Sequence, residues 1–168
     1  MGKREEREEL LSQLEERTSA RGLLNYAHEY YASYELIQSQ RPKMNEYFAV
    51  KYYLLCHALE LTMKAWLRHK GATYKELKTL GHDLERIMTV LYEQHQLLFS
   101  AEIQAMISLV NQHYSQKEFE YALKGTKTVP EITDLAGSVA LLQAKARFDI
   151  QLDGDPRRLR ELNDRQRK

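Results

Sequence analysis

The side chains best suited to catalysis or ligand binding occur in the stretch CHALELTMK, where His57, Glu60 and Lys64 stand three and four residues apart. On a helix these spacings place the three side chains on one face. Carboxylate-bridged di-iron bundles also use glutamate and histidine three apart, but in the order Glu-x-x-His, twice, and with two more glutamates. Here the order is reversed and occurs once. We therefore predict no metal site and no bound cofactor.

Glu60 and Lys64 have the favourable i, i+4 orientation of a helical ion pair. Two interpretations of this pair stay open. It is either a partly exposed salt bridge that contributes roughly a few tenths of a kcal/mol, or a polar group set into the core, because apolar residues surround both positions.

His82 stands between Gly81 and Asp83, where we expect the first turn of another helix. Asp83 would place a negative charge at that helix N-terminus, which the helix dipole favours. We interpret His82 as a packed residue at a helix end rather than as a catalyst.

Arg21 and His28 are separated by six residues, so on a helix they lie near one face, two turns apart. An arginine can stabilise the charge that develops on a phosphate during RNA cleavage, and a histidine can act as general acid and base. With 6 histidines in the chain such a pair also arises by chance. We take the chance match as the main interpretation.

Tyrosine is abundant, with 11 residues, of which five fall in two clusters. Tyrosine rings can stack on nucleic-acid bases, but they are more often half-buried, with the hydroxyl at the rim of the core. We expect the second arrangement for Tyr30, Tyr31, Tyr34, Tyr52 and Tyr53.

Composition limits the classes of protein that this chain can be. Its 168 residues fit one domain, and 43% hydrophobic with 29% charged residues is a globular composition. A net charge of +1 excludes a generally basic nucleic-acid coat. The single cysteine, Cys56, excludes an intrachain disulfide and a cysteine-based zinc site. The stretch GKREEREE is too charged for a signal peptide and no apolar run approaches a membrane span, so we expect a cytoplasmic protein without a membrane contact.

Hydrophobic periodicity predicts an all-α protein, an up-and-down bundle of four to five core helices with one or two added N-terminal helices. Residues 1–18 form a charged N-terminal helix, 19–152 the bundle, and 153–168 a basic tail that we expect to be mobile. The helix over 45–70 has the widest apolar arc and should lie centrally. Its inner face consists of Leu55, Leu59, Met63 and Trp66.

Three segments in a fixed order carry a family resemblance: YYLLCHALELTMKAWLRHKG, then LGHDLERIM, then NQHYSQKEFEYALKGTKTVP. The first two, within Tyr47 to Leu91, resemble the HEPN superfamily (higher eukaryotes and prokaryotes nucleotide-binding), with its A-x-E-L-x-x-K-A-like helix and its H-D-L opening the next helix. The third resembles the Y-x-x-K-x-x-E-Y…G…P segment of small bacterial HEPN-like proteins. The positions carried over there are Tyr114, Lys117, Glu120, Tyr121, Gly125 and Pro130.

The resemblance implies a helical bundle, commonly a homodimer, in RNA metabolism, toxin–antitoxin pairs or phage defence. Many HEPN proteins cleave RNA with R-x(4–6)-H on the last core helix, in a site composed across two subunits. Here that helix contains Arg147 but no histidine. We therefore expect a non-catalytic module that binds RNA, a nucleotide or a partner protein, such as a nucleotidyltransferase-type partner. The candidate ligand-binding residues are Lys64, His82, Tyr114, Lys117, Glu120 and Tyr121.

Two alternatives belong to other functional classes. In a metal-independent endoribonuclease, His28 or His82 would act as general acid and base while Arg21 stabilises the phosphorane. In an adaptor or oligomerisation protein, the N-terminal helices would carry the contact. An enzyme needs arginine and histidine converging in a cleft, a nucleotide binder a positive pocket lined by aromatic rings, and an adaptor a large apolar patch.

Overall fold

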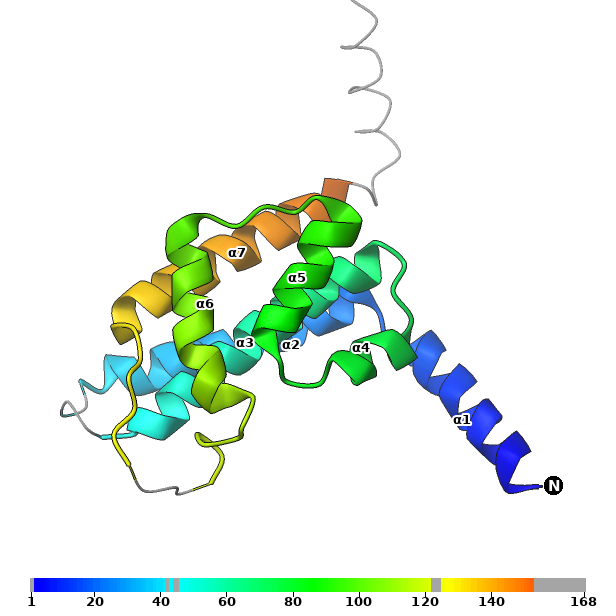
Figure 1. Ribbon diagram of the computed structural model, residues 1–168, viewed down its shortest axis with the longest axis horizontal. Coiled ribbons are helices and arrows are strands. Elements are labelled where there is room, and N and C mark those ends of the chain that lie inside the picture. The colour runs from blue at the N-terminus through cyan, green and yellow to red at the C-terminus, as the bar shows by residue number, and fades with distance from the viewer. Residues whose placement is uncertain (1, 42, 44–45, 122–124, 153–168) are drawn as a thin grey trace, which may run out of the picture.

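The computed structural model describes residues 2–41, 43, 46–121 and 125–152, and within them the chain forms seven helices and no strand. The all-α prediction is confirmed (Figure 1). The predicted tail, 153–168, lies outside the described residues. Among the described helices, none combines the length and the apolar character that a membrane crossing requires. The helices are α1 (Lys3–Arg17), α2 (Ala20–Ser39), α3 (Phe48–His69), α4 (Tyr74–Leu80), α5 (Leu84–His95), α6 (Ala101–Tyr114) and α7 (Ile132–Leu152).

α3 is the central helix, because it packs against α2, α4, α5, α6 and α7. Its predicted inner face is confirmed: Leu55 and Met63 are 0% exposed, Trp66 1% and Leu59 2%. The bundle has five long core helices, α2, α3, α5, α6 and α7, each of which contributes buried side chains. α2 therefore belongs to the core, and α1 is the one added N-terminal helix.

Short polar side chains fix where the helices around the centre begin. The hydroxyls of Ser19 and Ser100 accept from the backbone N–H groups three residues on, at 3.0 and 3.4 Å. Asp83 does the same for α5, accepting from the Arg86 N–H at 3.0 Å. The first turn of α5, and with it the preceding His82, is thereby held in place.

Of the clustered tyrosines, Tyr30, Tyr31 and Tyr53 are half-buried as expected, whereas Tyr34 and Tyr52 are buried. These rings lie on α2 and α3, which pack along each other for most of their lengths. The aromatic layer between the two helices ends beside the polar cluster described next.

Candidate functional site

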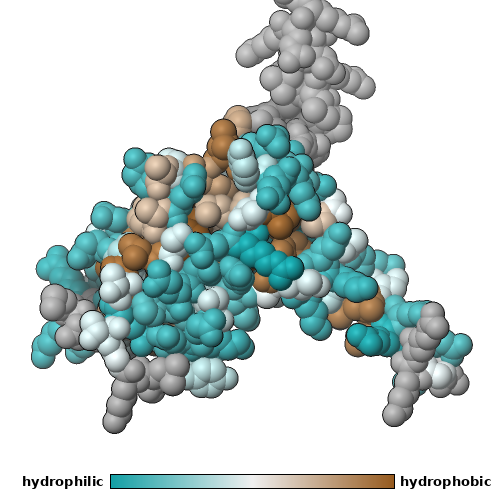
Figure 2. All heavy atoms as spheres, viewed as in Figure 1, coloured by the Kyte–Doolittle hydropathy of each residue, from teal (hydrophilic) through white to brown (hydrophobic). Residues whose placement is uncertain are grey.

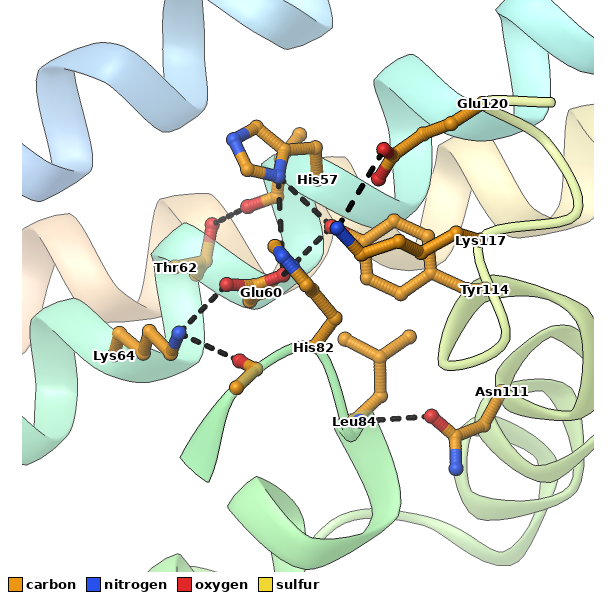
Figure 3. Close-up of polar contacts among 12 residues, drawn as sticks. His57, Glu60, Thr62, Lys64, His82, Leu84, Asn111, Tyr114, Lys117 and Glu120 are labelled. Atoms are coloured by element: carbon orange, nitrogen blue, oxygen red, sulfur yellow. Dashed lines mark hydrogen bonds and ion pairs between the residues drawn. The ribbon is translucent and has the colours of Figure 1, made fainter. Parts of the chain in front are cut away.

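A buried carboxylate, that of Glu60, is the centre of the polar interior (Figure 3). Glu60 is 2% exposed. Its Oε1 accepts from Lys64 Nζ at 2.6 Å. Its Oε2 accepts from the Tyr114 hydroxyl at 2.6 Å and lies 2.9 Å from His82 Nδ1. The second of the two open interpretations therefore holds, because the Glu60–Lys64 pair is set into the core.

The hydrogen-bond directions of the cluster follow from Glu60 being ionised. A carboxylate only accepts, so Tyr114 donates its hydroxyl proton to Glu60, and His82 carries a proton on Nδ1. The Tyr114 oxygen is then left to accept from His57 Nδ1, which lies 2.8 Å away. Both imidazoles are therefore fixed with Nδ1 inward and protonated, and Nε2 is left to carry any further contact.

The ionised state of Glu60 is the balance of opposing effects. Burial alone would raise its pKa, but the nearby His57 ring, the charge and hydrogen bond of Lys64 and the hydrogen bond from Tyr114 outweigh burial and lower the pKa to about 2. Burial, followed by the neighbouring Glu60 charge, raises the pKa of Tyr114, so its hydroxyl keeps the proton that it donates.

Three separate elements bring these residues together. α3 supplies His57, Glu60 and Lys64, and α6 ends with Tyr114. His82 comes from the turn between α4 and α5, where Gly81 takes φ +59° and offers its carbonyl oxygen to Lys64 Nζ at 2.7 Å. A positive φ with this ψ of −137° suits glycine and strains other residues.

Asn111 locks the same turn onto α6. Its Oδ1 accepts from the Leu84 N–H at 2.8 Å, and its Nδ2 donates to Asp83 Oδ1 and to Glu85 Oε2, each at 3.1 Å. Because Asn111 and Tyr114 stand three residues apart on α6, one helix face holds both the turn and the carboxylate. His82 is therefore a hydrogen-bond partner of Glu60 as well as a packed residue at a helix end.

His57 sits inside an aromatic frame. The Tyr53 ring stacks on it with centroids 5.6 Å apart, and the Tyr30 ring meets it edge-on at 4.4 Å. Tyr30 belongs to α2 and Tyr114 to α6, so the His57 imidazole of α3 links three helices of the bundle. The His57 side chain is 16% exposed and that of His82 37%, which makes His82 the more accessible ring.

One ring nitrogen each of His57 and His82 and one carboxylate oxygen of Glu60 lie within 4.8 Å of one another, close enough for one metal ion. Two histidines and one carboxylate are a donor set that suits zinc. A metal ion would have to compete with the Tyr114 hydroxyl and with His82 for the Glu60 carboxylate. The cluster forms a hydrogen-bonded network that needs no metal ion. The prediction that the chain has no metal site is not tested by this geometry.

The predicted binding residues divide into two groups. Lys64, His82 and Tyr114 converge on Glu60, as Figure 3 shows.

Lys117 and Glu120 follow α6 and pair with each other at 3.9 Å, on the side of the network where His57 and Tyr114 meet (Figure 3). Lys117 takes φ +59°, an uncommon value for a lysine. Tyr121, 61% exposed, makes no ring contact within the described residues.

The residues of the ribonuclease alternative are arranged differently from the sequence expectation. His28 lines a groove of about 490 Å³ between α2 and α7, and Arg21 is not among the lining residues. The arginine in that groove is Arg147 of α7, beside Tyr31 and Phe148. His82, the other candidate base, belongs to the Glu60 network.

Sequence reasoning did not assign a role to His57 or to Asn111. His57 was considered only as half of a metal motif, although its spacing from Glu60 placed both on one helix face. Asn111 carried no signal, because its partner is a backbone N–H that only the fold brings near it.

Comparisons of this chain with family models, with curated proteins and with solved structures yield no match.

Proposed function

We propose that this protein is a non-catalytic, HEPN-like helical module that binds a phosphate-bearing ligand, either RNA or a nucleotide, at the open side of the Glu60 network. The observation that carries the proposal is that one buried carboxylate orients both imidazoles at Nδ1, that of His82 directly and that of His57 through the Tyr114 hydroxyl. Within the part of the chain that the structure describes, neither Nε2 makes a hydrogen bond, so both remain for a ligand.

The chemistry of the surrounding side chains suits such a ligand. An imidazolium ring donates through Nε2 to a phosphate oxygen, and charge-assisted bonds of this kind are strong. The Lys117 side chain, 45% exposed, adds a cation beside the same site. Tyr121 offers an exposed ring on which a base can stack.

Binding is favoured over catalysis because the network lacks a free cation at its centre. RNA cleavage needs a fixed positive charge beside the acid–base group. Lys64 is the cation nearest to Glu60, and its ammonium is engaged by the Glu60 carboxylate and by the Gly81 carbonyl. Among the described residues, no arginine forms a hydrogen bond or ion pair with His57, Glu60 or His82.

Titration with fluorescent single-stranded RNA, with AMP and with inorganic phosphate tests the proposal and separates the sources of phosphate. We expect saturable binding that His82→Ala weakens at least about tenfold, the effect of losing one charge-assisted hydrogen bond. Lys145→Ala, an exposed lysine of α7, is the matched control and should bind as the wild type does. Absence of binding to all three probes, or equal binding by both variants, would refute the proposal.

The setting of this function rests on the resemblance alone. We infer a cytoplasmic homodimer in a toxin–antitoxin or phage-defence system, with a nucleotidyltransferase-type protein as a candidate partner. Co-expression with a nucleotidyltransferase encoded beside its gene, followed by purification of the untagged partner, tests this setting. Failure to form a complex would reject the nucleotidyltransferase-type partner, and it would not affect the proposal that the protein binds a phosphate-bearing ligand.

A second candidate function is metal-independent RNA cleavage in the groove between α2 and α7, because His28 and Arg147 line one groove with two aromatic rings. Structured and single-stranded RNA incubated with the protein in EDTA provides the test, beside His28→Ala, Arg147→Ala and His82→Ala. Cleavage lost in the first two variants and kept in the third would support this candidate. No cleavage above that of the buffer would reject it.

A further inference from the structure

α1 leaves the bundle as an arm beside α4 (Figure 1). Its last turn is held firmly: Arg68 Nη1 donates to the Glu15 carboxylate, Arg68 Nη2 to the Glu15 carbonyl at 2.9 Å, and the Tyr74 N–H to Glu15 Oε2 at 2.6 Å. No α1 residue belongs to the buried core of the described residues. A helix of 15 residues has little stability of its own without tertiary contacts.

The arm carries an apolar stripe with acidic residues beside it. Leu10 is 55% exposed, and Leu11 and Leu14 are half-buried on the adjoining positions. Glu6 lies one turn before Leu10, and Glu9 directly precedes it, both exposed. In Figure 2 apolar surface is visible at the root of the arm. A stripe of this kind, with i and i+4 leucines, is typical of a helix that docks in a groove.

A cleft of about 610 Å³ with complementary chemistry lies at the end of α3, between α4 and α5. Leu67, Leu80 and Val90 line it with apolar surface. Among the lining residues are the exposed cations Lys75 and Arg86 and one acid, Glu76, whose carboxylate is engaged by the Thr73 N–H and hydroxyl. Leucines would therefore meet apolar residues, and the acidic positions of α1 would meet cations.

The arm and the cleft share α4, because Glu15 binds the Tyr74 N–H at the start of α4 while Lys75, Thr79 and Leu80 of the same helix line the cleft. The Arg68 and Tyr74 contacts direct α1 away from the body (Figure 1), and none of the described α1 residues is among those that line the cleft of its own chain. In a two-fold dimer built around α4, each arm meets the cleft of the other chain, and the contact closes on itself.

We propose that α1 docks in this cleft of a second copy of the chain, reciprocally, with Leu10 and Leu14 on the apolar floor and Glu6 and Glu9 facing Lys75 and Arg86. The contact is independent of the Glu60 network and of any ligand bound there.

Light scattering coupled to size exclusion at micromolar protein is the first measurement, with a dimer expected. Two charge-reversed variants separate the two halves of the contact: the arm variant Glu6→Lys/Glu9→Lys and the cleft variant Lys75→Glu/Arg86→Glu. Each should be monomeric alone. Mixing them should restore a dimer, because the acidic arm of the cleft variant meets an unchanged cleft, and the basic arm of the other variant meets an acidic cleft.

Circular dichroism checks that each variant is folded, and Lys145→Glu serves as the control reversal outside the cleft, with a dimer expected. A wild type that stays monomeric up to about 100 μM would overturn the proposal, since specific oligomers form well below that concentration. A dimer that survives both reversals, or two monomeric variants that fail to associate on mixing, would equally overturn it.

Discussion

Glu60 shows how a single residue can organise the interior of a small helical protein. Desolvation of a carboxylate is costly, and here it is offset by a lysine, a tyrosine and a histidine that come from three elements. Removal of the carboxylate leaves these groups buried with fewer partners. The residue therefore links stability to the orientation of both imidazoles.

Glu60→Gln should destabilise the protein by about 3–5 kcal/mol at pH 7, because Lys64 would keep its charge in the core without a counter-ion. Urea unfolding of both proteins measures the difference. Glu93→Gln, at an exposed position of α5, is the matched control and should change the free energy of unfolding by less than about 1 kcal/mol.

The same carboxylate predicts acid sensitivity. Its pKa is lowered from 4.5 to about 2 in the folded chain, so folding is favoured above the unfolded value and the advantage disappears as pH falls from 4.5 toward 2. The wild type should lose stability over that interval, and Glu60→Gln should lack that part of the loss. Parallel pH profiles for the two proteins would contradict the assignment of Glu60 as the ionised centre.

Cys56, next to this cluster on α3, is predicted to be unreactive. Burial, with a smaller effect of Glu60, raises the pKa of its thiol, and the residue is 0% exposed. A chromogenic disulfide reagent at pH 8 should modify native protein slower than unfolded protein by at least about 10³-fold, since reaction requires opening of the core. Rapid modification of the native protein would mean that α3 is not buried on this side.

Among the helices, α3 was the easiest to predict from the sequence. Its apolar positions at spacings of three and four identified the buried face from sequence alone, because a central helix must hide a wide arc. The helix ends were predictable where a polar cap stands, as at Ser19, Asp83 and Ser100. Periodicity could not tell whether α2 belongs to the core, since its half-buried tyrosines also fit a surface helix.

The site was predictable only within one helix. His57, Glu60 and Lys64 share a face by spacing, but the sequence separates Glu60 from His82 by 22 residues and from Tyr114 by 54. No local rule specifies such contacts. They depend on how the α4–α5 turn and the end of α6 approach α3, and Gly81 and Asn111 determine that approach.

Leu59→Ala tests the central position of α3. Leu59 is 2% exposed, so truncation loses transfer free energy and leaves a cavity, at a cost of about 2–5 kcal/mol. Leu36→Ala on α2, 67% exposed, is the control and should cost less than about 0.5 kcal/mol. An unchanged denaturation midpoint for Leu59→Ala would show that α3 does not pack as described.

For the whole molecule, the contacts separate a cooperative body, α2 to α7, from the arm α1. The body shares one cluster of buried side chains, to which α1 contributes none. Tight hydrogen bonds link remote parts of the body, such as Trp66 Nε1 to Asp149 Oδ2 at 3.0 Å and the Tyr52 hydroxyl to the Pro130 carbonyl at 2.6 Å. The arm is attached chiefly through Arg68.

Deletion of residues 2–17 should therefore leave α2 to α7 folded, with a single cooperative thermal transition and only a small loss of stability, because the missing Arg68 and Tyr74 hydrogen bonds end at the solvent-accessible Glu15. The Ser19 cap stays in place, so α2 keeps its start. The shortened protein should be monomeric in light scattering while its far-ultraviolet signal falls by the share of one helix. A broad, non-cooperative transition would show that α1 is part of the core. A dimer that persists without the arm would instead place the contact between chains on another surface of the bundle.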